Sequence, residues 1–403
     1  MKTISLMVAS VLLLAGLAPQ QSLAETSGVA GQDASPAATQ LAYQSSDQAG
    51  ASGSQSFELP KALQGLKVGG VFYLAYQNGK VGQGGGTDDA TTPFNQFVLN
   101  RGYLDVQKTI SPMFMGRYTT DITRDGTGDW KTRIKYLYGK FSFKGNNAIS
   151  GIGVEFGQVH NPWLDFEESI NGFRVQGTMF LERNGIFNSA DVGIVAGSDL
   201  GGQADDAYRK DVSSHYAGRW GTWQFGVYNG GGYHAPENNL NKVMEGRLTI
   251  RPLPDVAPGL QVSALGMTGK GNTVAAPDFQ VFDGMVSYQS VWVTGTAQYY
   301  NGKGNSGGSA VTSSGDARKQ DGYSVFGAVH VAKEHRLSVI GRYDRFDSNT
   351  DSDTNDVVKR SIVGLAYAFV GNNLVLLDYE NDDHSTDGYA SDQQFQASLQ
   401  LVF

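Results

Sequence analysis

The sequence predicts an all-β protein, a transmembrane antiparallel β-barrel of about sixteen strands. Three observations support this. The chain begins with an export signal, apolar and polar residues alternate with a period of two through residues 64–403, and no later apolar run is long enough for a spanning helix. A membrane crossed after export must then be crossed by strands. Charged residues are only 17% of the 403, below the roughly 25% of soluble domains.

The N-terminus has the pattern of a secretory signal peptide. Lys2 precedes an apolar run at 4–18, and Ser22 to Ala24 form a small-x-small cleavage site. The run is short for a spanning helix, so we predict a cleaved signal over 1–24, with a retained membrane anchor as the alternative. Residues 25–63 are rich in Ala, Ser, Gln and Gly, which predicts a flexible tail.

The last segment of the chain shows the clearest alternation. One face is apolar and consists of Phe395, Ala397, Leu399, Leu401 and Phe403. The other face is nearly all amide or hydroxyl and consists of Gln394, Gln396, Ser398, Gln400 and Val402. Alternation over about ten residues is typical of strands with lipid on one side and a lumen on the other; a secreted soluble β-protein is the alternative. The segment resembles the strand by which barrel-assembly machinery recognises Gram-negative outer-membrane proteins. The resemblance assigns that signal to Phe395, Leu399, Leu401 and Phe403.

Sixteen strands follow from the alternation of tight and long connections. The predicted strands are 66–77, 96–109, 112–123, 130–143, 150–158, 211–220, 222–230, 242–252, 259–268, 277–288, 290–301, 319–332, 335–346, 357–369, 373–381 and 393–403. Short turns and long loops then alternate, as in outer-membrane barrels. Residues 191–197 also have a strand pattern, but a strand there breaks this parity. We therefore place them in the long connection 159–210, with eighteen strands as the alternative.

Basic residues are predicted on the lumenal faces. Lys131, Arg133 and Lys135 share one face of their strand, and Thr132, Ile134, Tyr136 and Tyr138 share the other. Arg or Lys at the middle of the lipid face costs about 2–4 kcal/mol, so the cations are expected to face inward. The same argument directs five further arginines to the lumen, namely Arg101, Arg117, Arg247, Arg251 and Arg342. This basic wall either attracts anions or only hydrates the lumen through internal ion pairs.

The third external connection is unlike the other loops. It contains Trp163, Phe166, Phe173, Met179, Phe180 and Leu181. So many large apolar groups favour a loop folded into the lumen and packed on the barrel wall, with a loop at a subunit contact or over the rim as the alternative. We expect Asp165, Glu167 and Glu168 to face the basic wall and create a transverse field. Arg174 and Arg183 belong to the same constriction loop.

Several motifs in this order resemble those of Gram-negative porins, and most of all the phosphate-selective porin family. They are FVLNRGYLDVQKTISPMFMGRYTTDI (97–122), RIKYLYGKF (133–141), GQVHNPW (157–163), MFLERN (179–184) and VGIVAGSDLG (192–201). The resemblance implies a sixteen-stranded homotrimeric channel, with the third loop inside and phosphate selectivity from lumenal cations. Residues 100–102 (Asn-Arg-Gly) depart from the family, which often has consecutive basic residues there.

The remaining patterns exclude other classes. The chain has no cysteine and a net charge of −8, which argues against thiolate metal sites and nucleic-acid binding. A nucleotide-binding loop motif is missing from the sequence, and residues 347–358 lack the Gly and Glu of a calcium-binding EF-hand. We therefore expect no enzyme, metal or cofactor, but passive diffusion of small ions or solutes across the outer membrane, among lipid and lipopolysaccharide. A surface-binding or adhesion barrel and a barrel enzyme remain alternatives.

Overall fold

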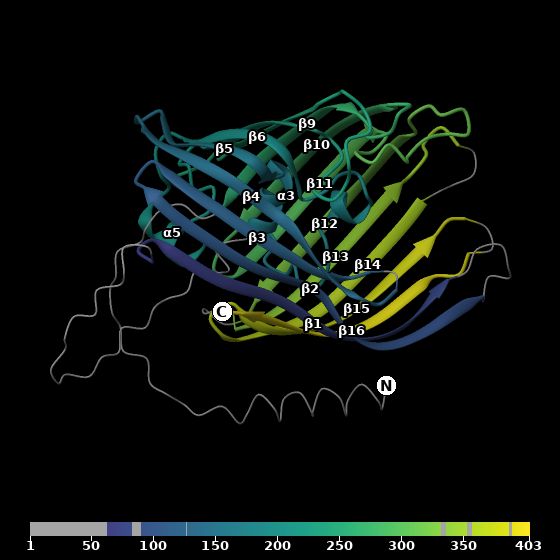
Figure 1. Ribbon diagram of the computed structural model, residues 1–403. Helices are drawn as coiled ribbons and strands as arrows, with labels where there is room; N and C mark the ends of the chain where they lie inside the picture. Colours follow the sequence, from purple (N-terminus) through teal and green to yellow (C-terminus); the bar gives the residue numbers. More distant parts are fainter. Residues whose placement is uncertain (1–62, 83–89, 126, 332–335, 353–356, 387–388) are drawn as a thin grey trace. The chain divides into compact units, whose positions relative to one another are not determined.

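The chain forms a closed barrel of sixteen antiparallel strands, as the sequence predicts. A computed structural model describes residues 63–82, 90–125, 127–331, 336–352, 357–386 and 389–403. Each strand pairs with its neighbour in the chain, and β1 pairs with β16 to close the barrel (Figure 1). The predicted signal peptide and nearly all of the predicted tail lie outside the described residues and stay predictions.

The strands are followed most easily as one list. They are β1 (Leu66–Gly82), β2 (Thr91–Ser111), β3 (Phe114–Arg124), β4 (Trp130–Gly145), β5 (Ile149–His160), β6 (Ala190–Leu200), β7 (Gly221–Tyr228), β8 (Val243–Ile250), β9 (Leu260–Lys270), β10 (Asp278–Gln289), β11 (Val293–Lys303), β12 (Lys319–His330), β13 (Leu337–Asp347), β14 (Val357–Val370), β15 (Asn373–His384) and β16 (Asp392–Val402). Within the described residues, three short helices lie in connections, namely α3 (Pro162–Ile170), α4 (Phe180–Arg183) and α5 (Asp206–Asp211).

One predicted strand is wrong, and one rejected strand is real. Residues 190–200 form β6, which pairs with β5 and β7, whereas the predicted strand 211–220 lies in a connection that contains α5. We call 201–220 the α5 connection. Its backbone leaves the extended conformation at Tyr216, where φ is +47°. Arg251 donates to the carbonyls of Gly218 and Tyr216, so these groups bond outside the strand ladder. The two errors cancel, which kept the strand count correct.

The outer face of the barrel is apolar on nearly every strand. Its exposed side chains include Phe156, Leu248, Phe282, Val325 and Val363. Exposed aromatic residues also lie at the strand ends, with Trp130 at the long-loop end of β4 and Trp292, Tyr367, Phe369 and Phe403 at or near the tight-turn ends. This apolar band with aromatic girdles is typical of transmembrane barrels. Among the described residues, no helix is long and apolar enough to span a membrane.

The C-terminal strand closes the barrel with the orientation that the alternation predicts. Gln396, Ser398 and Gln400 are buried on the inner face, whereas Leu401 and Phe403 are exposed on the outer face. The Phe403 ring stacks on Phe72 of β1 with 5.9 Å between centroids. The backbone N–H of Gly70 donates to the Phe403 carbonyl at 3.0 Å. The end of the chain therefore takes part in barrel closure.

A β-bulge in β4 corrects one predicted face. Thr119 of β3 pairs with Tyr136, and Thr120 pairs with Ile134, so Lys135 is the extra residue. A bulge shifts every following side chain to the opposite face. Tyr136 and Tyr138 are therefore buried in the interior rather than exposed on the outer face as the alternation predicted. Sequence alternation cannot locate the one residue at which the pairing slips.

Candidate channel constriction and lumenal charges

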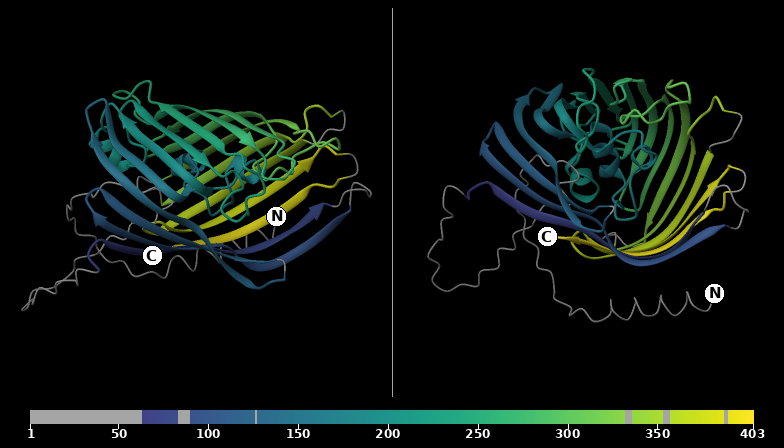
Figure 2. Two further views of the ribbon diagram at one scale, coloured as in Figure 1. Left: turned by 45° about the horizontal axis from the view of Figure 1, so that its top comes forward. Right: turned by 45° about the vertical axis from the view of Figure 1, so that its right-hand side comes forward.

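The connection 161–189, here called L3, folds into the barrel (Figure 2). Its helix α3 begins at a capped turn, because the Asn161 side chain accepts hydrogen bonds from the N–H groups of Trp163 and Leu164 at 3.0 and 3.1 Å, and Pro162 follows. Glu245 on the inner face of β8 accepts from Asn161 Nδ2 at 2.9 Å and from the Trp163 N–H at 3.1 Å. A carboxylate at a helix N-terminus is favourable. The contacts with Glu245 on the barrel wall therefore fix the position of the first turn of α3.

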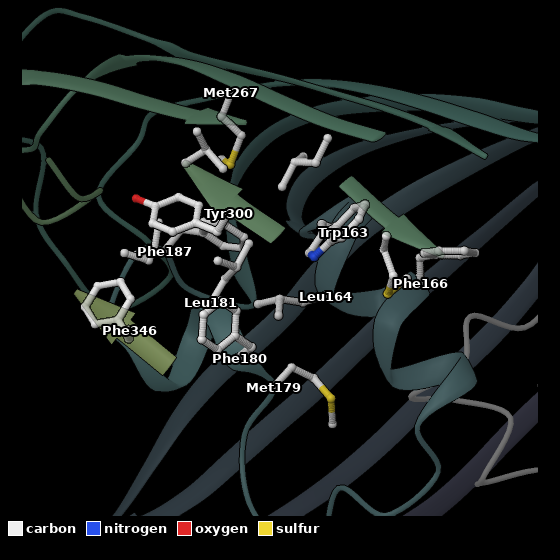
Figure 3. Packing of buried hydrophobic residues seen from close by; sticks show 14 of the residues in the cluster. Trp163, Leu164, Phe166, Met179, Phe180, Leu181, Phe187, Met267, Tyr300 and Phe346 are labelled. Atoms are coloured by element: carbon white, nitrogen blue, oxygen red, sulfur yellow. The ribbon is translucent and has the colours of Figure 1, made fainter. Parts of the chain in front are cut away.

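L3 is packed on an apolar part of the inner wall. Trp163, Phe166, Phe180 and Leu181 are fully buried. Figure 3 shows L3 residues packed with Met267, Tyr300 and Phe346 of the strands. We call the inward residues that L3 covers the covered wall: Val243, Leu265, Met267, Phe279, Val281, Met285, Tyr300 and Phe346. The apolar loop residues therefore lie inside the barrel, as the sequence indicated.

Polar contacts hold the far end of L3. Arg183 donates to both carboxylate oxygens of Glu380 on β15 at 2.8 Å. Arg342 of β13 donates to the Thr178 carbonyl at 2.9 Å. Arg174 stays within the loop, where it pairs with Glu168 at 2.9 Å and Glu182 at 3.2 Å. L3 is thus anchored to β8 at its start and to β13 and β15 near its end.

The three acidic residues of α3 do not face one wall together. Asp165 accepts a hydrogen bond from Tyr216 of the α5 connection and lies 3.8 Å from His160 Nε2. Glu167 accepts from Gln298 of β11 at 2.6 Å. Each carboxylate interacts with a different residue of the predicted basic wall, Asp165 with Arg247, Glu167 with Arg342 and Glu168 with Lys135. The three interactions point in different directions, as expected for nearby residues on one helix, and the transverse field stays a prediction.

Two predicted lumenal arginines form a partly exposed cluster. Arg133 Nη2 lies 2.6 Å and Arg101 Nη1 3.3 Å from the same Asp121 oxygen, while the arginine side chains remain 30% and 29% exposed. Tyr233, from the connection after β7, donates to Asp121 at 2.8 Å. We call Arg101, Asp121, Arg133 and Tyr233 the open cluster. It contains two cations for one carboxylate.

The other predicted basic residues have different surroundings. Lys135 is buried with its Nζ 4.4 Å from the Tyr103 ring centroid, and Lys131 is an exposed residue at the long-loop end of β4, 3.1 Å from Asp125. Arg117 is buried against Asp105 at 2.7 Å. Neither Lys131 nor Arg117 belongs to the open cluster.

Three inward arginines are covered rather than exposed to a lumen. Arg247 lies 4.3 and 4.6 Å from the Phe166 and Tyr216 ring centroids, and Arg251 lies beneath the α5 connection. Arg342 pairs with Asp344 at 2.8 Å and has 8% of its surface exposed. The inward direction follows the alternation. These side chains do not line open water as we expected, because L3 and the α5 connection cover them.

Sequence reasoning missed several interior groups. Tyr216 and Tyr233 come from connections, and Tyr136 and Tyr138 follow the bulge. Glu380, the partner of Arg183, is one of many carboxylates on strands. No local pattern in the sequence marks Tyr216 or Tyr233 as an interior residue, because both lie outside the alternating strands.

Comparisons with known proteins show the fold but no family. No family model matches the chain, and no curated protein matches its sequence. The fold is similar to that of the outer membrane channel DcaP of Acinetobacter baumannii (14% identity, 85% of this chain and 99% of that chain, TM-score 0.54). It is also similar to an anion-selective porin from Comamonas acidovorans (11%, 84% and 99%, 0.54). The trimer form of OmpT from Vibrio cholerae is a third (14%, 84% and 100%, 0.51). These likenesses agree with a porin-type barrel fold.

Proposed function

We propose that this chain is an outer-membrane porin, a channel through which small hydrophilic solutes and ions diffuse passively. The observation that carries the proposal is the closed sixteen-strand barrel with an apolar outer face, charged inner residues and L3 folded inside. A loop that narrows a water-filled barrel selects solutes by the width and the charge of the passage. The resemblance of the motifs to porins and the likeness to the channel DcaP support the same function.

We assign an anion preference to the open cluster. Arg101 and Arg133 share Asp121, so the cluster has a formal charge of +1 and keeps both guanidinium groups partly exposed. Cations that line a low-dielectric passage raise the local anion concentration. Guanidinium groups match phosphate oxygens in geometry, so inorganic phosphate, which the sequence resemblance implies, is the anion to test first. The similar barrel described as an anion-selective porin supports this direction.

The remaining assignments concern location and assembly. The predicted signal peptide and the apolar outer face support the bacterial outer membrane, with lipid and lipopolysaccharide around the barrel. Phe395, Leu399, Leu401 and Phe403 are proposed as the signal that barrel-assembly machinery reads on β16. A homotrimer is proposed from the motif resemblance, and the trimer form of the similar Vibrio cholerae protein supports it.

The first experiment is the conductance of the purified protein in a planar lipid bilayer, with a salt gradient to give the reversal potential. We expect stable ohmic steps and a reversal potential that indicates anions. Added phosphate should reduce the chloride current if phosphate occupies the passage. Steps with cation preference would retain the channel but reject the assignment to Arg101 and Arg133. A folded barrel without steps would reject the channel and favour a surface-binding protein or an enzyme.

A further inference from the structure

A carboxylate without a partner lies beneath L3. Asp283 is an inward residue of β10 and is fully buried. Among the described residues, neither of its two carboxylate oxygens has a hydrogen-bond partner. An isolated buried carboxylate is strongly unfavourable, so native proteins compensate it with a counter-charge, a proton or a metal ion. Asp283 therefore needs a partner that the protein's described residues do not supply.

Two more unpartnered oxygens belong to the same site. Gln298 Nε2 donates to Glu167 Oε1 at 2.6 Å, which leaves Gln298 Oε1 and Glu167 Oε2 without partners among the described residues. In the register of β10 and β11, Asp283 lies opposite Tyr300 and Met285 lies opposite Gln298. Asp283 and Gln298 are therefore diagonal neighbours on the inner face. Such neighbours lie about 7–8 Å apart, within reach of longer side chains. Glu167 is the charged group that acts on Asp283.

The local charges do not balance. The nearest cation to Glu167 is Arg342, which is held by Asp344 through contacts of 2.9 and 2.8 Å. Arg342 is thus shared between Glu167 and Asp344, and among the described residues no cation acts on Asp283, so Glu167 and Asp283 lack a full counter-charge when both are ionised. A divalent cation would neutralise this charge.

We propose that Asp283, Glu167 Oε2 and Gln298 Oε1 bind a calcium ion that links L3 to the barrel wall. These residues offer four oxygen atoms, and Ca²⁺ takes six to eight oxygen ligands, including water, with tolerant geometry. Carboxylate and amide oxygens without imidazole or thiolate select a hard cation. Among the described residues, no three acidic, histidine or cysteine side chains are placed to hold a metal ion together, so the proposed site uses two carboxylates, the Gln298 amide and water. The ion would join α3 to β10 and β11.

The competing explanation is a proton shared between Glu167 and Asp283. Like charges forced together commonly hold one proton. The two explanations differ in what an amide replacement does. Asp283→Asn removes a calcium ligand and should abolish any stabilisation by calcium. If the site holds only protons, the same change removes a buried charge and leaves the protein equally or more stable, whatever cation is present.

The test compares the full-length protein in detergent with and without calcium. The midpoint of thermal unfolding is followed by the gel shift between folded and unfolded barrel, in EGTA and in millimolar CaCl₂, with MgCl₂ as a second probe. Terbium luminescence excited through nearby Tyr and Trp reports direct binding. We expect calcium to raise the wild-type midpoint by at least about 2 °C, magnesium to have a smaller effect, and calcium to quench the terbium signal.

Three variants locate the effect. Asp283→Asn and Glu167→Gln should lose the calcium shift and the terbium signal. Asp278→Asn changes the same residue type on the same strand, but Asp278 is partly exposed and paired with Lys270 and Lys303, so it should keep both. An equal calcium shift in Asp283→Asn, or no shift and no luminescence in the wild type, would overturn the proposal. None of these readouts depends on conductance, so the site can fail while the channel function stands.

Discussion

In the open cluster, Arg101 and Arg133 share one carboxylate and remain about one-third exposed, whereas by the covered wall Arg342 is buried against Asp344. Both sets lie on inward faces of strands. They differ in what lies above them, since L3 covers Arg342 and leaves Arg101 and Arg133 accessible. An inward charge can therefore act on solutes in one place and only on stability in another.

The same contrast applies to the apolar residues. A lumenal face is expected to be polar, but Leu265, Phe279 and Met285 point inward and are buried. They form the surface on which L3 packs, and their strands are apolar on both faces beneath it. Large apolar residues on an inner face therefore indicate where a connection has folded into the barrel.

The largest effect is expected where L3 meets the covered wall. Trp163→Ala removes a fully buried indole and leaves a cavity, which should lower the free energy of unfolding by about 3–5 kcal/mol. Urea titration followed by the gel shift measures it. Single-channel current should also become noisier, because α3 loses its main packing residue. Trp292→Ala is the control, since Trp292 is 51% exposed on the outer face; equal losses for the two variants would contradict the packing of L3 inside the barrel.

A smaller loss is expected at Arg342. Arg342→Met leaves the buried Asp344 without its closest cation. This should lower the free energy of unfolding by about 3 kcal/mol, at the low end of the range for breaking buried ion pairs. Arg360 remains 3.8 Å away and limits the loss. Arg345→Met on the same strand removes an arginine that is 29% exposed and paired with Asp321 and Asp347, so about 0–1 kcal/mol is expected. Similar losses in the two urea titrations would show that L3 does not seal Arg342 from solvent.

The sequence predicted the barrel better than it predicted the interior. The number of strands and the orientation of the C-terminal strand depend on local alternation, which can be read directly from the sequence. The roles of Arg247, Arg251 and Arg342 depend on which connection lies above each strand, and alternation gives only the inward direction. The exchange of 211–220 for β6 has a similar cause, because the extended pattern is interrupted at Tyr216 by contacts with Arg251. The bulge at Lys135 changed the faces of Tyr136 and Tyr138.

The comparison extends to the outer face. Val325 lies near the middle of β12 and is exposed, whereas Val331 is exposed just past the tight-turn end of the same strand. If lipid surrounds the barrel, Val325→Arg should lower the free energy of unfolding in lipid vesicles by about 2–4 kcal/mol, and Val331→Arg by about 0–1 kcal/mol. Equal effects at the two depths would contradict a membrane-spanning barrel.

The replacement of Arg101 and Arg133 should have the smallest effect in free energy, but it reports most directly on ion selectivity. Removing two partly exposed charges with Arg101→Gln and Arg133→Gln should lower the anion-to-cation permeability ratio on the order of twofold to fivefold, since exposed charges act through water and are screened by salt. Reversal potentials at low and high salt measure the ratio, and the change should shrink as salt increases. The gel shift checks that the barrel folds, because Asp121 loses both arginines in this variant and keeps the hydrogen bond from Tyr233 and the charge of Lys135.

Two controls separate charge from shape at the open cluster. The paired Lys replacements keep both positive charges and should preserve most of the anion preference, although they lose the planar contact with phosphate. Lys131→Gln removes an exposed cation at the end of β4, beside Asp125, and should leave the ratio unchanged. If the Gln pair and Lys131→Gln behave alike, no single cluster controls selectivity. The field would then come from the whole inner surface, where buried ion pairs contribute little and the position of L3 decides which charges a solute meets.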